Sequence, residues 1–431
     1  MKSIYLNKAT RIEGNANIEI DIEDGRINSA RFMVHEFRGF EKFVQGRQVE
    51  HVPQIVSRIC GLCSASHQVA GFRAVEDAIG FKPSKSLKNL REIVVLGEWI
   101  ASHALSYFFL TMPDFVGARG GIFELMHKDP EVVREAYALR MAGQRITELL
   151  AGRATHPVSL GVGKFLSGIG EETIRQVREK AEEVRDRVGR LISTGKFERP
   201  EQRIAFPKEQ RLNLLTFSEN SDHKSFRIYD RQGKNTDSFD YDEFPEYISE
   251  MRGGESFAKF PYLTRLGFPE GILVVGPLAR FFAEDGPLSD PDVAGFDLAD
   301  TFKDKSRLTL ESFDVCRLLE IYWAARKILE LLGEVDVGDV NHEVDTSVSG
   351  KGIGVLEAPR GVLVHTYLVN RGTLEKARLL VATQFNNACI NLLLREIAES
   401  HAGADGLSEE GEYLIGRCVR LFDPCLSCAT H

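Results

Sequence analysis

Two pairs of cysteines with the same spacing, one near the start of the chain and one at its end, constrain the fold most strongly. Cys60 and Cys63 form the first Cys-x-x-Cys pair, and Cys425 and Cys428 form the second, in a chain of 431 residues. The two sulfurs of such a pair can converge on one ion, and soft thiolates select zinc, nickel, copper or iron over hard cations. If the four sulfurs bind metal together, the fold must bring its two ends into one site.

A structural zinc ion held by all four cysteines is the simplest interpretation of two such pairs. The pairs of a structural zinc site usually lie within one small module, whereas these two lie far apart in the sequence. The first pair also precedes a predicted helix, residues 64–79, whose N-terminal amides favour the thiolate form. The spacing therefore indicates metal binding and argues against an ordinary zinc module.

The composition excludes several classes of protein. A formal net charge of −9 and the lack of a basic stripe argue against binding of nucleic acid. With 43% hydrophobic and 27% charged residues, the chain is typical of a soluble globular protein with a sizeable core. The longest apolar runs, such as residues 390–394, are too short to span a bilayer, and no export signal is recognisable. We expect a cytoplasmic protein without a membrane span.

Hydrophobic periodicity predicts several long helices, which suit a helical bundle. They are expected at residues 87–112, 131–151, 172–193, 308–332 and 373–401. Alternating apolar residues on both sides of Asp24-Gly25 predict a β-hairpin within residues 18–34. Strand-like runs occupy residues 271–275 and 352–368, and the remainder of residues 196–300 is expected to mix loops and strands.

The remaining cysteines limit the chemistry of the chain. Cys316, Cys389 and Cys418 stand singly, and an iron–sulfur cluster generally needs four thiolates, so we interpret them as small buried hydrophobic residues. The glycines of residues 350–354 lack the spacing of a dinucleotide fingerprint and lead into a strand. Electron carriers and any nicotinamide must therefore be bound by other subunits.

The residues around the cysteines are more specific than the cysteines themselves. The first pair stands in Arg58-x-Cys60-Gly61-x-Cys63-x-x-x-His67, and the second in Asp423-Pro424-Cys425-x-x-Cys428-x-x-His431. Both closely resemble the signature motifs of nickel-iron hydrogenase large subunits. Arg11-Ile12-Glu13-Gly14, Arg38-Gly39-Phe40-Glu41 and Ala358-Pro359-Arg360-Gly361 extend the resemblance over essentially the whole sequence.

The resemblance implies an α+β fold that is predominantly helical. It predicts one domain of residues 1–431, with a central bundle of long helices and small peripheral β-sheets. The metal site would be built from residues 60–67 and 423–431. The segment Cys63-Ser64-Ala65-Ser66-His67, and Ser102-His103 where other relatives often have an aspartate beside a histidine, look more like the soluble, multimeric, cofactor-coupled branch of the family.

The resemblance also implies the metal ligands. Cys60 and Cys425 correspond to terminal ligands of nickel, and Cys63 and Cys428 to ligands that bridge nickel and iron. The iron of such centres carries carbon monoxide and cyanide. Glu41 and His431 match positions that bind magnesium or a similar ion, such as iron, near the chain end.

Further residues gain roles only through their motifs. His67, one helical turn after Cys63, could donate a hydrogen bond to the bridging sulfur, although a lone histidine is more often structural. Arg360, fixed by Pro359 and held by Asp423, could polarise hydrogen, although most arginines lie on the surface. Two weaker candidates remain, each otherwise an ordinary residue: Glu13 as the proton gate, and Thr383, seen as a mid-helix threonine, as a hydrogen-bond partner of cyanide.

A hydrogenase cleaves H2 into a proton and a hydride equivalent, so it needs a base, and the resemblance assigns that role to Cys425. The implied partners are a small subunit with iron–sulfur clusters and further subunits that bind flavin and NAD(P), with ferredoxin or a similar molecule as another possible acceptor. The alternatives are a protein like the quinone-proximal subunit of respiratory complex I, or a scaffold protein with structural zinc. Neither would have hydrogenase activity.

Overall fold

The computed structural model describes residues 2–6, 9–23, 26–195, 203–207, 212–219, 223–252, 256–304, 308–403 and 406–431. Its helices are α1 (Phe40–Phe43), α2 (Val52–Val56), α3 (Ser64–Ala78), α4 (Lys85–Ala104), α5 (Met112–Phe115), α6 (Ile122–Lys128), α7 (Pro130–Ala151), α8 (Glu171–Ser193), α9 (Phe244–Tyr247), α10 (Pro277–Arg280), α11 (Pro291–Ala294), α12 (Ser312–Leu332), α13 (Ala382–His401), α14 (Glu409–Phe422) and α15 (Leu426–Ala429).

The strands are mostly short. They are β1 (Lys2–Leu6), β2 (Ala16–Glu23), β3 (Arg26–Val34), β4 (Leu160–Gly161), β5 (Lys164–Phe165), β6 (Asn213–Glu219), β7 (Lys224–Tyr229), β8 (Asn235–Asp240), β9 (Ile248–Arg252), β10 (Lys259–Leu263), β11 (Leu273–Val274), β12 (Gly350–Ala358), β13 (Gly361–Asn370), β14 (Thr373–Leu380), β15 (Ala402–Gly403) and β16 (Gly406–Leu407). Single turns of 3-10 helix include η1 (Ser57–Ile59).

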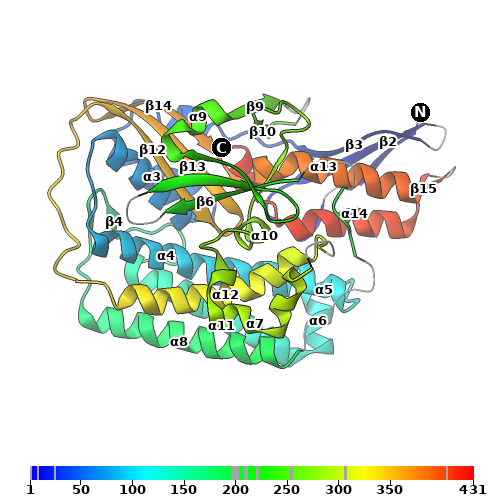
Figure 1. Cartoon of the computed structure of the whole chain (residues 1–431), viewed down its shortest axis with the longest axis horizontal. Helices are drawn as coiled ribbons and strands as arrows, with labels where there is room; N and C mark the ends of the chain where they lie inside the picture. The colour runs from blue at the N-terminus through cyan, green and yellow to red at the C-terminus, as the bar shows by residue number, and fades with distance from the viewer. Residues whose placement is uncertain are drawn as a thin grey trace.

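A layer of long helices forms one side of the molecule (Figure 1). Helix α4 packs against α7 and α12, and both α7 and α12 pack against α8. Gly97 on α4 and Gly143 on α7 allow a close approach, because a Cβ on Gly143 would lie 2.6 Å from the backbone nitrogen of Ala101. The predicted helices 131–151 and 172–193 agree with α7 and α8 within one residue at their starts.

Helix α4 continues through a π-helical segment, η2 (Leu105–Thr111), into α5. By length and composition this stretch, Lys85–Phe115, could cross a membrane, but 83% of its most apolar window is buried inside the protein. It is therefore the core helix of the bundle, and a surrounding shell of protein explains its apolar character.

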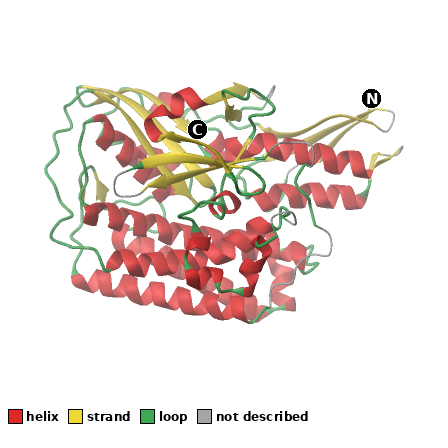
Figure 2. Ribbon diagram, in the orientation of Figure 1, coloured by secondary structure: helices red, strands yellow, loops and turns green. Residues whose placement is uncertain are grey.

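Small antiparallel sheets lie on the other side of the helical layer (Figure 2). Strands β12, β13 and β14 form one of them, and Pro359 and Arg360 form the tight turn between β12 and β13. Gly352 and Gly354 of β12 lie against α3, where a Cβ on Gly354 would meet the carbonyl oxygen of Ala70 at 2.1 Å. These glycines therefore serve close packing of a strand on a helix.

The predicted helix 373–401 was wrong over its first part. Residues Thr373–Leu380 form β14, and the helix α13 begins at Ala382. The apolar residues of this stretch fit either structure locally, and antiparallel pairing with β13 decides for the strand. The helix predicted from 308 likewise begins later, at Ser312.

The region 196–300 contains short strands in separate sheets, among them β6 to β8, with β11 parallel to β6. At the N-terminal end, β2 and β3 form the predicted hairpin, with Glu23 opposite Arg26. The predicted turn residues 24 and 25 lie outside the described residues.

The two ends of the chain meet beside α3 and α13. The backbone amide of Leu426 donates to the carbonyl oxygen of Glu13 at 3.2 Å, and the amide of Arg38 donates to that of Thr430 at 2.8 Å. These contacts fix the C-terminal segment between two N-terminal segments, Arg11 to Gly14 and Arg38 to Glu41, that the sequence motifs had singled out.

Candidate metal centre

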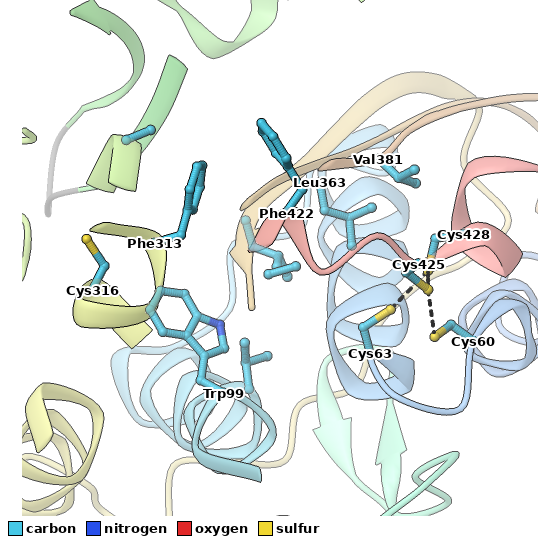
Figure 3. Packing of buried hydrophobic residues seen from close by; sticks show 14 of the residues in the cluster. Cys60, Cys63, Trp99, Phe313, Cys316, Leu363, Val381, Phe422, Cys425 and Cys428 are labelled. Atoms are coloured by element: carbon cyan, nitrogen blue, oxygen red, sulfur yellow. Dashed lines mark hydrogen bonds between the residues drawn. The ribbon is translucent and has the colours of Figure 1, made fainter. Parts of the chain in front are cut away.

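The four paired cysteines form one buried cluster. The Sγ atoms of Cys60 and Cys425 lie 3.2 Å apart, those of Cys63 and Cys428 lie 3.1 Å apart, and those of Cys425 and Cys428 lie 2.8 Å apart. All four sulfurs lie within 4.8 Å of one another, and each side chain is at most 5% exposed. Figure 3 shows the two pairs facing each other, with Cys425 and Cys428 on one side and Cys60 and Cys63 on the other.

Local structure explains how each pair is presented. Cys60 follows η1 in an extended conformation, Cys63 is the N-cap residue of α3, and Cys425 is the N-cap residue of α15. Two cysteines at helix N-termini place their sulfurs near backbone N–H groups, which favour the thiolate. Because metal–thiolate bonds are about 2.3 Å long, four sulfurs at these separations can share one or two soft metal ions.

Electrostatics couple metal binding to proton release. Burial raises the pKa of Cys425 to about 11 and that of Cys428 well above its ordinary value. Hydrogen bonds from the other sulfurs, Cys425 first, together with the charge of Arg360, lower the pKa of Cys60 well below its ordinary value. Bound cations would displace the remaining thiol protons and compensate the buried negative charge.

A small cavity of about 20 Å³ adjoins the sulfurs, which is room for roughly one water-sized molecule. It is lined by Cys63, His67, Ala358, Arg360, Leu363, Val381, Ala382, Thr383, Cys425 and Cys428. The lining is mostly apolar apart from Arg360, Thr383 and the cysteines, so a small diatomic ligand or substrate fits its chemistry.

Arg360 reaches this cavity from the β12–β13 turn. Its Nε donates to the carbonyl oxygen of Asp423 at 2.7 Å, its Nη2 to Oδ1 of Asp423 at 3.1 Å, and its Nη1 to Oγ of Ser102 at 3.3 Å. Burial opposes the charge, but Asp423 and the cysteine sulfurs outweigh it and raise the pKa of Arg360. Pro359 does not line the cavity, and its carbonyl oxygen accepts from Arg280 at 3.0 Å.

Glu13 lies against the second cysteine pair from the N-terminal segment. The thiol of Cys425 donates to Oε2 of Glu13 at 3.2 Å, and the amide of Ser427 donates to the same oxygen at 3.1 Å. The hydroxyl of Ser427 donates to Oε1. Because Glu13 is itself partly exposed, it connects a buried sulfur with the surface of the chain.

Thr383 lies in the first turn of α13, and the expectation of a mid-helix threonine was therefore wrong. The error follows from the strand β14, which occupies the residues that had been assigned to the start of that helix. The Oγ1 of Thr383 accepts from the amide of Cys425 at 2.9 Å, and the side chain lines the cavity. Its hydroxyl hydrogen can still be donated.

His67 contacts the sulfur of Cys428, its Nε2 lying 3.4 Å from Sγ, rather than that of Cys63 in its own motif. The C-terminal segment brings Cys428 to 3.1 Å from Cys63, and this places a second sulfur within reach of the histidine. Burial lowers the pKa of His67 to about 4, so the ring is neutral.

Glu41 and His431 lie close to each other, with Nε2 of His431 3.6 Å from Oε1 of Glu41. Burial opposes ionisation of Glu41, but the hydrogen bond and charge of His431 lower its pKa. Oε1 also accepts from the amide of Leu379 at 2.8 Å, and Nδ1 of His431 lies 2.6 Å from the carbonyl oxygen of Cys428. Oxygen and nitrogen donors thus converge beside the sulfur cluster.

Sequence reasoning missed several buried polar residues that hold the site. Glu98 accepts from the amides of Ala65 and Ser66 at 2.8 and 3.0 Å and so caps the start of α3. Arg280 donates to the carbonyl oxygens of Ala358 and Pro359 at 3.0 Å and is paired with Glu320 at 2.7 Å. None of these residues stands in a motif with recognisable spacing, so the sequence carried no signal for them.

Comparison with known proteins agrees with this geometry. The family model for nickel-dependent hydrogenases matches residues 38–138 and 211–431, and a model described as HoxL-like matches residues 3–37. A protein of the F420-non-reducing hydrogenase of Methanothermobacter marburgensis is 30% identical, covering 100% of this chain and 95% of that protein. The beta subunit of the NAD-reducing hydrogenase HoxS of Cupriavidus necator is also 30% identical over the same shares.

Solved structures give the same result. The structure of an NAD+-reducing [NiFe]-hydrogenase in the H2-reduced state superimposes with a TM-score of 0.89 at 27% identity, covering 100% of both chains. The Ni-Fe-Se hydrogenase of D. vulgaris Hildenborough shares the fold, with a TM-score of 0.76 at 22% identity over 100% of both chains. The predicted α+β fold, long helices with small sheets, is thereby confirmed.

The match of the family model decides against both alternatives, the zinc scaffold and the protein like a complex I subunit. A cluster of four buried cysteines fits a nickel-dependent enzyme that oxidises or forms H2. The chain belongs to the nickel-dependent hydrogenase family.

Proposed function

We propose that the four cysteines bind a nickel–iron centre at which H2 is reversibly split, with Cys60 and Cys425 as terminal nickel ligands and Cys63 and Cys428 as bridging ligands. The observation that carries this proposal is the contact between Sγ of Cys425 and Oε2 of Glu13, at 3.2 Å, within a buried cluster of four sulfurs. When bound, such a centre supplies the Lewis acidity that polarises H2 and accepts its electrons.

The residues of the chain then separate the proton from the electrons. Cys425 is the base that takes the first proton, because its sulfur adjoins both the cavity and a carboxylate. Glu13 accepts the proton from that sulfur and releases it toward the surface, since a proton can pass only between groups within hydrogen-bond reach or one water away. Ser427 holds both oxygens of Glu13 in place.

The cavity residues orient the small ligands. Arg360, held by Asp423 and Ser102, presents a fixed positive charge to the cavity, where it would polarise H2. Thr383 keeps a hydroxyl hydrogen that would donate to an iron-bound cyanide, and the apolar lining would suit carbon monoxide. Glu41 and His431 would bind magnesium, or iron, beside the sulfur cluster.

Electrons would leave through a small subunit with iron–sulfur clusters and further subunits that bind flavin and NAD(P). The similarity to the beta subunit of the NAD-reducing hydrogenase HoxS supports a nicotinamide acceptor, and the equal identity to an F420-non-reducing hydrogenase leaves ferredoxin or a similar carrier as the second candidate. Location in the cytoplasm stays a prediction.

Replacement of Glu13 by glutamine tests the proton route. Glu13→Gln keeps the size and the hydrogen bonds of the side chain but removes proton exchange, so nickel and iron contents should stay normal. Hydrogen oxidation and hydrogen–deuterium exchange with solvent should both fall at least tenfold, equivalent to about 1.4 kcal/mol. Glu13→Asp should recover part of both rates. Isotope exchange at the parental rate in Glu13→Gln would show that the proton leaves by another path.

A further inference from the structure

A chain of hydrogen bonds leads from the sulfur of Cys428 away from the cavity. Nε2 of His67 lies 3.4 Å from Sγ of Cys428, and Nδ1 of His67 lies 3.1 Å from Nε2 of His365. Nδ1 of His365 lies 2.8 Å from the hydroxyl oxygen of Tyr367. Each side chain in this series thus uses its polar atoms for the next one.

Two elements align the chain. His67 lies in the first turn of α3, one turn from Cys63, while His365 and Tyr367 are two residues apart on β13 and therefore point to the same face of the strand. That face packs on α3. His67, His365 and Tyr367 are 1%, 0% and 0% exposed, so solvent does not compete for these hydrogen bonds.

The chain can be polarised in only two directions. A neutral imidazole has one donor and one acceptor nitrogen, and burial keeps both rings neutral by lowering the pKa of His67 to about 4 and that of His365 well below its ordinary value. If the ring of His67 donates through Nε2, its Nδ1 must accept from His365. Nδ1 of His365 must then accept from the hydroxyl of Tyr367.

A metal-bound thiolate selects one of these directions, since it has no proton and can only accept. We propose that His365 and Tyr367 are positioning residues, which hold His67 in the tautomer that donates from Nε2 to the sulfur of Cys428. This inference rests on the proposed function in one respect, because it requires metal bound at the four cysteines. It adds two residues that no cysteine motif contains.

The expected effect is on the redox potential of the metal centre. Hydrogen bonds to a ligating thiolate draw electron density from the sulfur, which favours the reduced metal and makes the midpoint potential less negative. Consecutive hydrogen bonds polarise one another in a medium of low dielectric, so the hydroxyl of Tyr367 strengthens a bond two residues away. A purely structural network would stabilise the fold without changing the potential.

The experiment compares Tyr367→Phe, His365→Leu and the double variant with the parent, each as the complete metal-loaded complex. The readout is the midpoint potential from a redox titration of the nickel electron paramagnetic resonance signal, with metal content and Tm measured on the same samples. Tyr229→Phe is the matched control, because it removes the hydroxyl of another buried tyrosine, on β7 in a different sheet.

We expect Tyr367→Phe to shift the midpoint potential to a more negative value and His365→Leu to shift it further. Tyr367→Phe should add no shift in the His365→Leu background, because the link to His67 is already broken. Tyr229→Phe should leave the potential unchanged even if it lowers the Tm.

A parental potential in both Tyr367→Phe and His365→Leu would overturn the inference, as would a shift by Tyr367→Phe that persists in the His365→Leu background. If Tyr367→Phe failed to assemble, a parental potential in His365→Leu alone would overturn it. A parent complex without any nickel would refute the proposed metal centre, which keeps the failure of that proposal distinct from the failure of this one.

Discussion

Cys316 and Cys425 carry the same group in equally buried positions, each with 0% exposure, but only Cys425 has other sulfurs around it. Burial raises the pKa of Cys316 well above its ordinary value, so it stays a thiol and packs as a small apolar side chain in α12. The environment of a cysteine, rather than its burial, therefore decides whether it can bind metal.

This contrast predicts opposite results for the same substitution. Cys425→Ser should lose nickel or at least tenfold in activity, because an alcohol is a harder and far less acidic ligand than a thiol. Cys316→Ser should keep both, with a loss of stability of about 1 kcal/mol for the buried hydroxyl. Metal analysis and H2 uptake of the two purified complexes check this, and equal damage by both substitutions would contradict the assignment.

Arg360 gives a second prediction for a single residue. Lysine keeps the charge but cannot reproduce the three hydrogen bonds that Nε, Nη1 and Nη2 make to Asp423 and Ser102. Arg360→Lys should therefore retain nickel and iron and lose at least tenfold in turnover. Loss of metal from this variant would show that Arg360 supports the ligands rather than the reaction, and Arg378→Lys on partly exposed β14 is a suitable control.

Among the elements, α3 is the one whose start position determines the site, since it carries Cys63 at its N-cap and His67 in its first turn. Its first amides are satisfied by Glu98 from α4, because Cys63 provides no side-chain cap. The turn before β13 is held in a similar way by Arg280 of α10, through two backbone carbonyl oxygens. Each ligand-bearing element thus depends on a buried charge from another element.

Glu98 should make stability depend on pH. Burial raises its pKa to about 7 in the folded state, against 4.5 for the unfolded chain. Between these values the folded protein holds a proton that the unfolded chain releases, so stability falls as pH rises through this window, by up to about 3 kcal/mol.

Glu98→Gln removes that proton exchange, and we expect the Tm of the variant to change less than that of the parent between pH 5 and pH 7. Differential scanning calorimetry at both pH values measures the difference. Glu148→Gln, on the exposed side of α7, should retain the parental change. An unchanged pH dependence in Glu98→Gln would mean that Glu98 is already ionised at pH 5.

The whole molecule places one cluster of four metal-binding cysteines at the junction of its ends, and the three other cysteines are single and buried. No second group of metal-binding residues is found among the described residues. The chain therefore has ligands for the proposed reaction centre but not for a relay of iron–sulfur clusters.

The isolated chain, loaded with metal, should consequently reduce no nicotinamide or ferredoxin with H2, since an electron path from a buried centre to a protein surface needs intermediate carriers. Hydrogen–deuterium exchange should still proceed, because it needs only the metal centre and a proton route. Spectrophotometric assays of acceptor reduction, with the complete complex as positive control, test this. Acceptor reduction by the chain alone would disprove it.

The sequence by itself determined the features that depend on local order or on rare residue types. Two Cys-x-x-Cys pairs with their flanking residues predicted which sulfurs meet, and periodicity predicted helices such as α7 and α8, because burial of one helix face repeats along the chain. The family followed from the same motifs, since such spacings at both ends of one chain rarely arise by chance.

Only the tertiary structure decided the features that depend on contacts between distant segments. Pairing with β13 made a strand of Thr373–Leu380 and moved Thr383 to the start of α13. The meeting of the chain ends gave His67 its contact with Cys428 and Glu13 its contact with Cys425. Glu98, Arg280 and Tyr367 bear on the site only because folding buries them beside it, and a buried polar group takes its partner from whatever element packs against it.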